Sequence, residues 1–276
     1  MFPSSQPAAL LVHGLGGTEY DLGNLGRHLS DAGIATHIPL LPGHGGKPED
    51  LLGIGHETWI ETVTLAYREL RRKHRVVHLA GFCLGALIAL EVAKRERHRD
   101  RLVLLSPPLF LDGWSLPRNK CLRHIVYRLG SLADHMRLPE AEPFGIKNER
   151  VRNLIRARFS RGDGFHYPYV PLSSIRTVDE LRRKIKKDLG RLDCDTLIVH
   201  AREDEVTSLR SARYIARRLG GHVDLLELSD SYHMIMVDNE RQFVLERTQR
   251  FLCAPGARPP VPPAQPHWSG DAVAAA

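Results

Sequence analysis

The stretch VVHLAGFCLGALIALEVAK, residues 76–94, decides the fold. A β-branched, apolar run leads into Gly-Phe-Cys-Leu-Gly, and helix-favouring residues follow directly. This order is typical of a nucleophile elbow, a turn so tight that side chains two positions before and after its central residue would collide with the strand and the helix. Gly81 and Gly85 meet that requirement around Cys83. The pattern therefore places Cys83 at a helix N-terminus, where the helix dipole favours a thiolate. A buried, unreactive cysteine between two glycines is the alternative interpretation.

A second glycine-rich turn, His13-Gly14-Leu15-Gly16-Gly17, ends the first apolar run of the chain. Such a turn can present the N–H of Leu15 to a developing oxyanion, and the N–H of Leu84, directly after the nucleophile, would be the second donor. Glycine turns after strands are common, so this turn gains meaning only beside the elbow.

The remaining partners of an elbow nucleophile follow it along the chain as an acid and then a histidine. Asp204 comes a few residues after a buried β-type run, and His233 comes just after the last such run. His233 would take the proton from Cys83, and Asp204 would orient the imidazole. Asp195 and Asp230 are alternative acids. His233 could also be an ordinary member of the 15 histidines, but the four elements in this order favour a Cys-His-Asp triad.

Strand-like and helix-like runs alternate along most of the chain, which predicts the α/β fold class with a mainly parallel sheet covered by helices on both faces. The 276 residues suffice for one large domain with a sizeable insertion. Strands are expected at 8–14, 34–40, 76–80, 100–108, 194–201 and 222–228, and helices at 19–33, 56–74, after the elbow, at 208–219 and at about 239–252.

The alternation stops after residue 108. Residues 109–190 are basic, helical in pattern and interrupted by prolines. Long insertions at the carboxyl edge of a parallel sheet commonly become lids. We therefore predict a core formed by residues 1–108 and 191–253, a helical cap at 109–190, and a disordered, Pro- and Ala-rich tail at 254–276.

The net charge is +7, and much of the excess lies in two basic runs, residues 68–75 and 181–187. Solvated helix faces are the simplest interpretation of these runs. The alternative is a docking surface for an acidic partner, such as a carrier protein or the phosphates of a coenzyme A thioester. No interleaved aromatic residues or nucleic-acid motifs accompany the runs, so nucleic acid is not expected as a partner.

Several kinds of protein and site are not indicated by the sequence. It has no long uncharged apolar stretch and no basic-then-apolar leader, so we expect a cytoplasmic protein without integral membrane association. No C-x₂-C pair, P-loop, dinucleotide fingerprint or metal-ligand spacing occurs, and we expect neither cofactor nor metal. Reduced thiols are the default in the cytosol for all four cysteines, which are Cys83, Cys121, Cys194 and Cys253.

His44, in the loop LPGHGG, is expected to brace that loop beside the site by hydrogen bonding. Trp59 and Tyr67 share one face of an amphipathic helix and are predicted to be core residues. Three histidines on predicted strands receive structural roles: His37, His78 and His200.

With these residues the chain resembles the α/β-hydrolase superfamily, and within it the small bacterial carboxylesterases and monoacylglycerol lipases. The likeness covers residues 8–253 and is weakest in the insertion. LLVHGLGGTEYDLGNLGRHLSDAGIATHIPLLPGHGGKPEDL resembles that branch's oxyanion segment and following loop, AREDEV its acid segment and SYHMI its histidine segment. The resemblance implies oxyanion amides from Leu15 and Leu84, a triad completed by Asp204 and His233, and a helical cap over an acyl-binding pocket, inserted after the sixth strand of the sheet.

The nucleophile departs from that branch, which uses serine where this chain has Cys83. Cysteine in this box resembles dienelactone hydrolases and polyhydroxyalkanoate synthases, although the long amino-terminal region of the latter is not found here. An engineered replacement of serine would give the same sequence.

A cysteine nucleophile changes the expected chemistry. A Cys–His pair can hold a thiolate near neutral pH, and its acylation gives a thioester that reacts readily with water, amines or thiols. The sequence therefore predicts an esterase, thioesterase or acyltransferase. Two alternatives remain open: a non-catalytic member of the fold that binds an acyl or hydrophobic ligand, and a protein–protein module built on the basic cap and the proline-rich tail.

Overall fold

The computed structural model describes residues 3–116, 122–128 and 132–254. Its centre is a six-stranded sheet in the order β2-β1-β3-β4-β7-β8, in which every neighbouring pair is parallel. The predicted α/β fold class is therefore confirmed. The strands are β1 (Ala8–Val12), β2 (Ala35–His37), β3 (Val77–Phe82), β4 (Leu102–Leu105), β7 (Thr196–Ala201) and β8 (Val223–Leu228).

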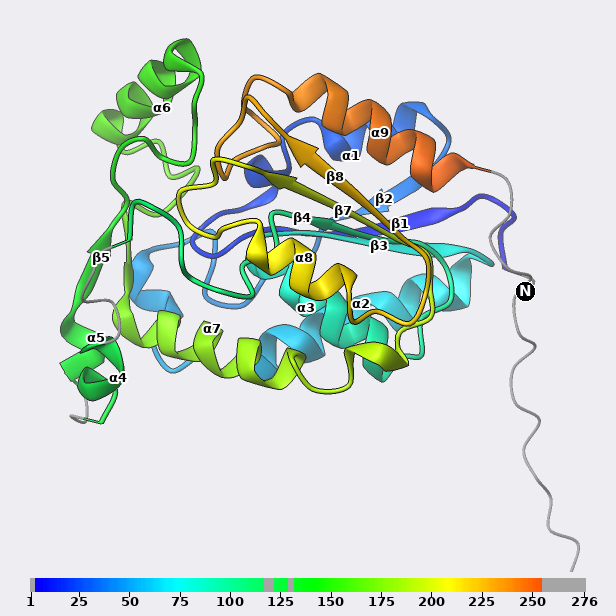
Figure 1. Ribbon diagram of the computed structural model, residues 1–276, viewed down its shortest axis with the longest axis horizontal. Coiled ribbons are helices and arrows are strands. Elements are labelled where there is room, and N and C mark those ends of the chain that lie inside the picture. Colours follow the sequence, from blue (N-terminus) through cyan, green and yellow to red (C-terminus); the bar gives the residue numbers. More distant parts are fainter. Residues whose placement is uncertain (1–2, 117–121, 129–131, 255–276) are drawn as a thin grey trace, which may run out of the picture.

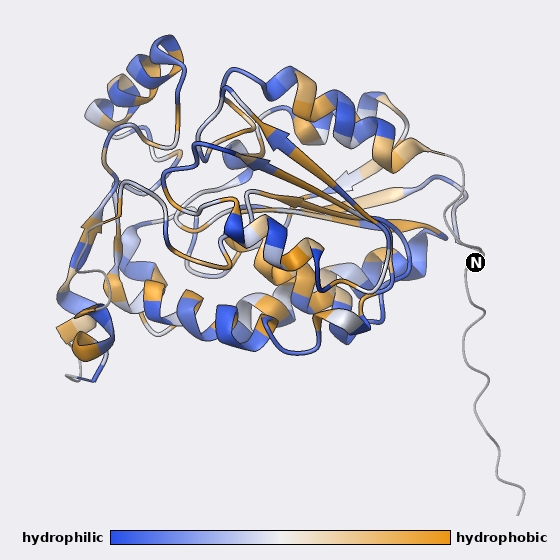
Figure 2. Ribbon diagram, viewed as in Figure 1, coloured by the Kyte–Doolittle hydropathy of each residue, from blue (hydrophilic) through white to orange (hydrophobic). Residues whose placement is uncertain are grey.

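Helices cover both faces of the sheet (Figure 1). One face carries α1 (Leu25–Asp31) and α9 (Arg241–Cys253), and the other carries α2 (His56–Lys73), α3 (Leu84–Arg95), α7 (Leu172–Ile185) and α8 (Arg210–Ala216). Figure 2 shows apolar residues along the central strands and polar residues on much of the outer helix surface. Burial on both faces explains why the central strands are continuous apolar runs.

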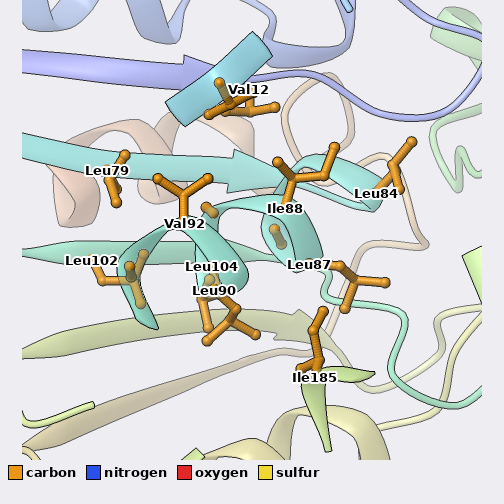
Figure 3. Close-up of a cluster of buried hydrophobic side chains, with 14 of the residues drawn as sticks. Val12, Leu79, Leu84, Leu87, Ile88, Leu90, Val92, Leu102, Leu104 and Ile185 are labelled. Atoms are coloured by element: carbon orange, nitrogen blue, oxygen red, sulfur yellow. The ribbon is translucent and has the colours of Figure 1, made fainter. Parts of the chain in front are cut away.

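The side chains of each strand alternate between two apolar clusters, one on each face of the sheet. In β1, Ala8, Leu10 and Val12 enter one cluster, while Ala9 and Leu11 enter the other, as the two-residue period of a strand requires. Figure 3 shows the first cluster, where side chains of β1, β3 and β4 meet those of α3 and α7. Full burial of one such leucine contributes about 1.5–3 kcal/mol. This packing stabilises β3, α3 and the elbow between them.

The helix predicted at 19–33 is interrupted in the structure. A short 3₁₀ turn, η1 (Glu19–Leu22), comes first, and α1 starts only after Gly23. Gly23 has φ +54, and a Cβ there would lie 2.6 Å from the carbonyl oxygen of Met236. The helix is interrupted here because the backbone at Gly23 passes close to the loop that follows β8. No local sequence pattern predicts this contact.

Residues 109–190, here called the cap, lie between β4 and β7 and contain α4 (Arg123–Val126), α5 (Leu132–His135), α6 (Glu149–Arg161) and α7. Besides these helices, two short strands that the sequence did not predict, β5 (Arg137–Pro139) and β6 (Tyr169–Pro171), pair there as a separate antiparallel sheet. The insertion follows the fourth strand of the central sheet in chain order rather than the sixth, because the described chain supplies only three strands before β4.

The carboxyl ends of the strands point toward the cap (Figure 1). Two further 3₁₀ turns, η2 (Pro48–Leu51) and η4 (Leu189–Arg191), complete the elements named here. Residues 255–276 of the tail predicted to be disordered, and Cys121, lie outside the described residues. Within the described ranges no helix combines the length and apolar character needed to cross a membrane, and Cys83, Cys194 and Cys253 are free thiols.

Candidate active site

Cys83 occupies the turn between β3 and α3 with φ 51 and ψ −120. This conformation is strained for a residue other than glycine. A Cβ at position 81 would lie 2.2 Å from the carbonyl oxygen of Gly85, and one at position 85 would lie 2.1 Å from that of Val12. Glycine is therefore required at both positions, and the local geometry is that of the predicted elbow.

His233 and Asp204 lie together at the carboxyl edge of the sheet. The Nδ1–H of His233 donates to Asp204 Oδ2 at 2.8 Å, and the other carboxylate oxygen accepts the N–H groups of Val206 and Thr207, each at 2.9 Å. His233 is 6% exposed and Asp204 2%. The Nε2 of His233 is buried without a hydrogen-bond partner among the described residues, so it is available to a reacting group.

The charges of the site support proton transfer to His233. Burial by itself lowers the pKa of His233, but Asp204 and Cys83 outweigh it and raise that pKa well above its usual value. Burial raises the pKa of Asp204, but His233, His200 and the N–H of Thr207 together outweigh it, so the pKa of that carboxyl is lowered. Asp204 thus remains ionised, and His233 can hold a proton beside the sulfur of Cys83.

The two alternative acids lie elsewhere. Asp195 directly precedes β7, at the opposite edge of the sheet, where its carbonyl accepts the N–H of Leu102. The carboxylate of Asp230 accepts from Asn239 and pairs with Lys147 at 3.4 Å. Of the three candidate acids, only Asp204 hydrogen-bonds to His233 among the described contacts.

Two residues that the sequence did not single out hold the backbone of His233. Its N–H donates to Glu205 Oε2 at 3.1 Å, and its carbonyl accepts the hydroxyl of Ser106 at 2.9 Å. Burial, with Asp204 adding to it, raises the pKa of Glu205 to about 7 against the opposing effect of His233. Neither residue stands out locally, because Glu205 is one of three neighbouring acids and Ser106 ends an ordinary apolar strand.

The turn after β1, residues 13–17, is here called the oxyanion turn. It adjoins the elbow, since a Cβ at Gly14 would lie 3.4 Å from the Cβ of Cys83. Leu41 N–H donates to His13 Nε2 at 3.1 Å, so the neutral ring carries its proton on Nδ1, which donates to the carbonyl of Gly14 at 2.9 Å. Burial lowers the pKa of His13 to about 4, which keeps the ring neutral.

His13 thereby sets the direction of the Leu15 N–H. The carbonyl of Gly14 and the N–H of Leu15 belong to one planar trans peptide and point to opposite sides. Leu84, the second predicted donor, is the first residue of α3, where the N–H groups have no intrahelical partner. Leu15 thus lies in the turn that adjoins the elbow, and Leu84 directly follows Cys83 at the start of α3.

His44 contacts the site's supporting loop rather than the nucleophile. Its Nδ1–H donates to the carbonyl of Pro42 at 3.2 Å, and its ring lies 5.0 Å from that of His13 and stacks on Tyr167 at 6.3 Å. Trp59 is fully buried and donates to the same Pro42 carbonyl. The remaining predicted structural side chains are placed as follows: Tyr67 and His78 are buried, His200 donates to the Thr207 carbonyl, and His37 is exposed on β2.

A cavity of about 250 Å³ lies between the cap and the core. Met234, which lines it, directly follows His233 in the sequence. Most of its lining is apolar or aromatic, and it includes Phe144, Ile146, Phe159, Phe165 and Met234. Polar groups enter from Asp21, Glu140, Arg158 and His166. Such a lining suits an apolar ligand with a few polar contacts.

Many side chains of the two basic runs form ion pairs, and no residue of either run lines this cavity. Arg68 pairs with Glu96 at 2.8 Å and Lys73 with Glu69 at 2.6 Å, both near the end of α2. In the second run Arg182 pairs with Asp179 and Lys184 with Glu57. These positions favour the interpretation as solvated helix faces. In the described part of the chain, no group of His, Cys, Asp and Glu side chains could hold a metal ion.

The chain is similar to several known proteins. It is 23% identical to a carboxylesterase of Bacillus subtilis (strain 168), over 91% of this chain and 94% of the relative. It is 24% identical to a thermostable monoacylglycerol lipase of Bacillus sp. (strain H-257), over 88% and 89%. A solved structure of a monoacylglycerol lipase from Paleococcus ferrophilus superposes with a TM-score of 0.74 at 21% identity, covering 91% of this chain and 96% of that one. The sequence profile of the Alpha/beta hydrolase family matches residues 9–247, and the chain therefore belongs to that family.

Proposed function

We propose that this protein is a hydrolase of carboxylic esters or acyl thioesters that works through a covalent thioester on Cys83. The observation that carries the proposal is the strained cysteine elbow, beside a buried His233–Asp204 pair whose Nε2 has no partner among the described residues. Family membership and relatives named carboxylesterase and monoacylglycerol lipase support ester hydrolysis.

Acylation begins with a proton moving from the Cys83 sulfur to Nε2 of His233. The thiolate then attacks the carbonyl carbon of the substrate, a C–S bond forms, and the carbonyl electron pair moves onto oxygen. The N–H groups of Leu15 and Leu84 stabilise this oxyanion. When the oxyanion collapses, the bond to the leaving oxygen or sulfur breaks, and His233 returns its proton to the leaving group as Asp204 stabilises the imidazolium.

Deacylation repeats these steps with water. His233 takes a proton from the water, its oxygen attacks the thioester carbonyl, and the C–S bond breaks to release the carboxylic acid and restore Cys83. An amine, alcohol or thiol in place of water would make the enzyme an acyltransferase, because a thioester transfers its acyl group readily to such acceptors.

The acyl part of the substrate is proposed to be apolar and to occupy the cavity between cap and core, whose lining is mainly hydrophobic. Coenzyme A or carrier-protein thioesters remain candidate donors by chemistry alone. The basic runs lend them no support, since Arg68 and Lys73 of the first run and Lys184 of the second pair with carboxylates of this chain, and no residue of either run lines the cavity.

The decisive experiment is intact-mass spectrometry after incubation with a panel of activated esters and acyl thioesters. We expect one acyl adduct per chain, located on Cys83 by peptide mapping and missing from Cys83→Ala. Rapid loss of the adduct in water supports the hydrolase, and faster loss to an added amine or thiol supports the acyltransferase. If no donor forms an adduct, the proposal fails and a non-catalytic, acyl-binding role becomes the better explanation.

Iodoacetamide gives an independent test of the nucleophile. Cys83 should be alkylated near pH 7 faster than buried Cys194 and exposed Cys253. Equal, slow labelling of these thiols would contradict a reactive Cys83–His233 pair.

A further inference from the structure

One segment of the cap, Phe165–Tyr167, lies directly on the oxyanion turn. The N–H of Tyr167 donates to the carbonyl of Gly16 at 2.8 Å. A Cβ at Gly16 would lie 3.4 Å from Cε1 of His166 and 3.5 Å from the Cβ of Tyr167. Just beyond the turn, the hydroxyl of Thr18 donates to the carbonyl of Phe165 at 3.3 Å. The cap therefore contacts the backbone of this turn directly.

Asp21 contacts the backbone of the same turn. Its carboxylate accepts the N–H of Gly14 at 3.1 Å, and the residue is 3% exposed. A Cβ at Gly17 would lie 1.9 Å from the carboxylate oxygen Oδ2. The turn thus contacts both the buried carboxylate of Asp21 and the ring of His166.

The ring of His166 and the carboxylate of Asp21 also interact electrostatically. Burial lowers the pKa of His166, but the carboxylates of Asp21 and Glu140, with the backbone of Tyr167 and Leu15, outweigh it and raise that pKa. Burial raises the pKa of Asp21 to about 6, and His166 and the Gly14 N–H oppose that rise. His166 also contacts its own backbone, since its Nδ1–H donates to the carbonyl of Tyr167 at 3.0 Å.

The same segment reaches a second loop of the core. The hydroxyl of Tyr167 donates to the carbonyl of Gly43 at 2.8 Å and accepts the N–H of Gly46 at 3.2 Å. The cap segment is therefore hydrogen-bonded to two core loops at once. Displacing it would break its hydrogen bond to the carbonyl of Gly16 in the oxyanion turn.

We propose that His166 and Asp21 are positioning residues that clamp the oxyanion turn, so that docking of the cap completes the donor pair facing Cys83. The inference rests on the function proposed above, because it assigns a role in stabilising the oxyanion formed during acylation. His166 lies in the cap, where the sequence resemblance is weakest, and nothing in the local pattern around Asp21 marks it for this role.

Two reactions of the Cys83 sulfur distinguish a role in oxyanion stabilisation from a general effect on folding. Acylation by an activated aryl ester passes through a tetrahedral oxyanion and needs both N–H donors. Alkylation by iodoacetamide forms a C–S bond while the C–I bond breaks and iodide leaves, so no oxyanion forms. The ratio of the two rate constants therefore reports on the oxyanion turn alone.

The experiment measures both rate constants under single-turnover conditions, by release of p-nitrophenolate from p-nitrophenyl butyrate and by intact mass with iodoacetamide. In His166→Ala we expect acylation to fall about 10- to 100-fold, less than the loss on deleting an oxyanion donor outright, while alkylation stays unchanged. His166→Gln should recover part of the rate, because its amide can donate to the backbone carbonyl of Leu15, which in the wild type favours the protonated His166 ring, and Asp21→Asn should show a smaller loss than His166→Ala. The matched control is His124→Gln, a substitution of an exposed cap histidine in α4, which should alter neither rate.

Unchanged acylation in both His166→Ala and Asp21→Asn would overturn the inference and leave the proposed function intact. Equal losses in both reactions would also overturn it, because they would show damage to the Cys83–His233 pair. If the wild-type protein is never acylated, the proposed function fails and the inference falls with it. If His166→Ala does not fold, the comparison of His166→Gln with His124→Gln still decides the matter.

Discussion

At the amino edge of the central sheet the buried side chains of Asp100 and His98 are paired, whereas at the carboxyl edge the Nε2 of His233 has no partner among the described residues. At the amino edge Asp100 accepts the N–H of Val77 at 2.9 Å and the guanidinium of Arg71 at 2.7 Å. Both ring nitrogens of His98 are bonded, to the hydroxyl of Tyr67 and the carbonyl of Arg101. At the carboxyl edge two non-glycine residues, Cys83 and Ser106, have positive φ.

This difference indicates that the amino edge contributes mainly to stability and the carboxyl edge mainly to catalysis. Satisfied buried groups contribute to the free energy of unfolding, and the strained or unpaired groups at the other edge are available to a substrate. Substitutions at the carboxyl edge should therefore change catalytic rates more than stability, and substitutions at the amino edge should do the reverse. Four variants test this contrast.

The largest effect is expected from Cys83→Ala. Removing the sulfur should lower turnover of an activated ester by at least about 10⁴-fold, as loss of a covalent nucleophile does, with little change in the free energy of unfolding. Steady-state kinetics and urea unfolding measure the two quantities. Cys253→Ala, at an exposed thiol, is the control. An active Cys83→Ala protein would end the triad assignment.

Asp204→Asn should follow, with a loss in kcat of roughly 10³- to 10⁴-fold. The amide cannot stabilise a protonated His233, although it keeps the volume of the carboxylate. Asp230→Asn changes an exposed carboxylate on a neighbouring loop and should leave kcat unchanged. If both variants keep wild-type kcat, Asp204 is not the acid of the site.

The opposite pattern is expected from Asp100→Ala at the amino edge. It leaves the buried N–H of Val77 without its acceptor and breaks the pair with Arg71, so the free energy of unfolding should fall by about 2–3 kcal/mol. The value of kcat/KM measured well below the unfolding temperature should not change. Glu69→Ala, which removes an exposed pair within α2, is the control for both quantities. A loss of activity without a loss of stability would contradict the contrast between the edges.

The last prediction concerns Glu205→Gln, whose effect on stability depends on pH. Burial raises the pKa of Glu205 from 4.5 to about 7, so between these values the folded protein binds more protons than the unfolded chain. Wild-type stability should therefore fall as the pH rises from about 4.5 to 7.

The glutamine variant lacks this titration and should be more stable than the wild type at pH 8 by about 3 kcal/mol relative to their difference at pH 4.5. Urea unfolding of both proteins at the two pH values measures it. An identical difference at both pH values would show that the Glu205 carboxyl does not titrate as proposed.

The elbow could be predicted from sequence because its requirements are local. Two glycines flank the central cysteine, a strand-forming run precedes it and a helix-forming run follows, and each of these properties belongs to a few adjacent residues. The placement of Asp204 and His233 was accessible through their order after strands, since the carboxyl ends of parallel strands meet at one edge.

The features that sequence did not predict depend on contacts between distant segments. Gly23 interrupts a helical pattern because it meets the backbone of Met236. β5 and β6 are three residues each and include prolines, so neither has the length or pattern of a strand. Glu205 and Asp21 resemble surface acids until the fold buries them.

The hydrogen bonds of His13 give the oxyanion turn a spectroscopic reporter. A neutral ring that accepts at Nε2 from Leu41 and donates at Nδ1 to Gly14 holds one buried proton that exchanges slowly with water. Nitrogen-15 NMR of the ring should therefore give one protonated and one unprotonated nitrogen signal across the neutral pH range. Because the bonded carbonyl shares its peptide plane with the Leu15 N–H, the chemical shift of that single proton follows the orientation of the donor, in the resting protein and during each acylation.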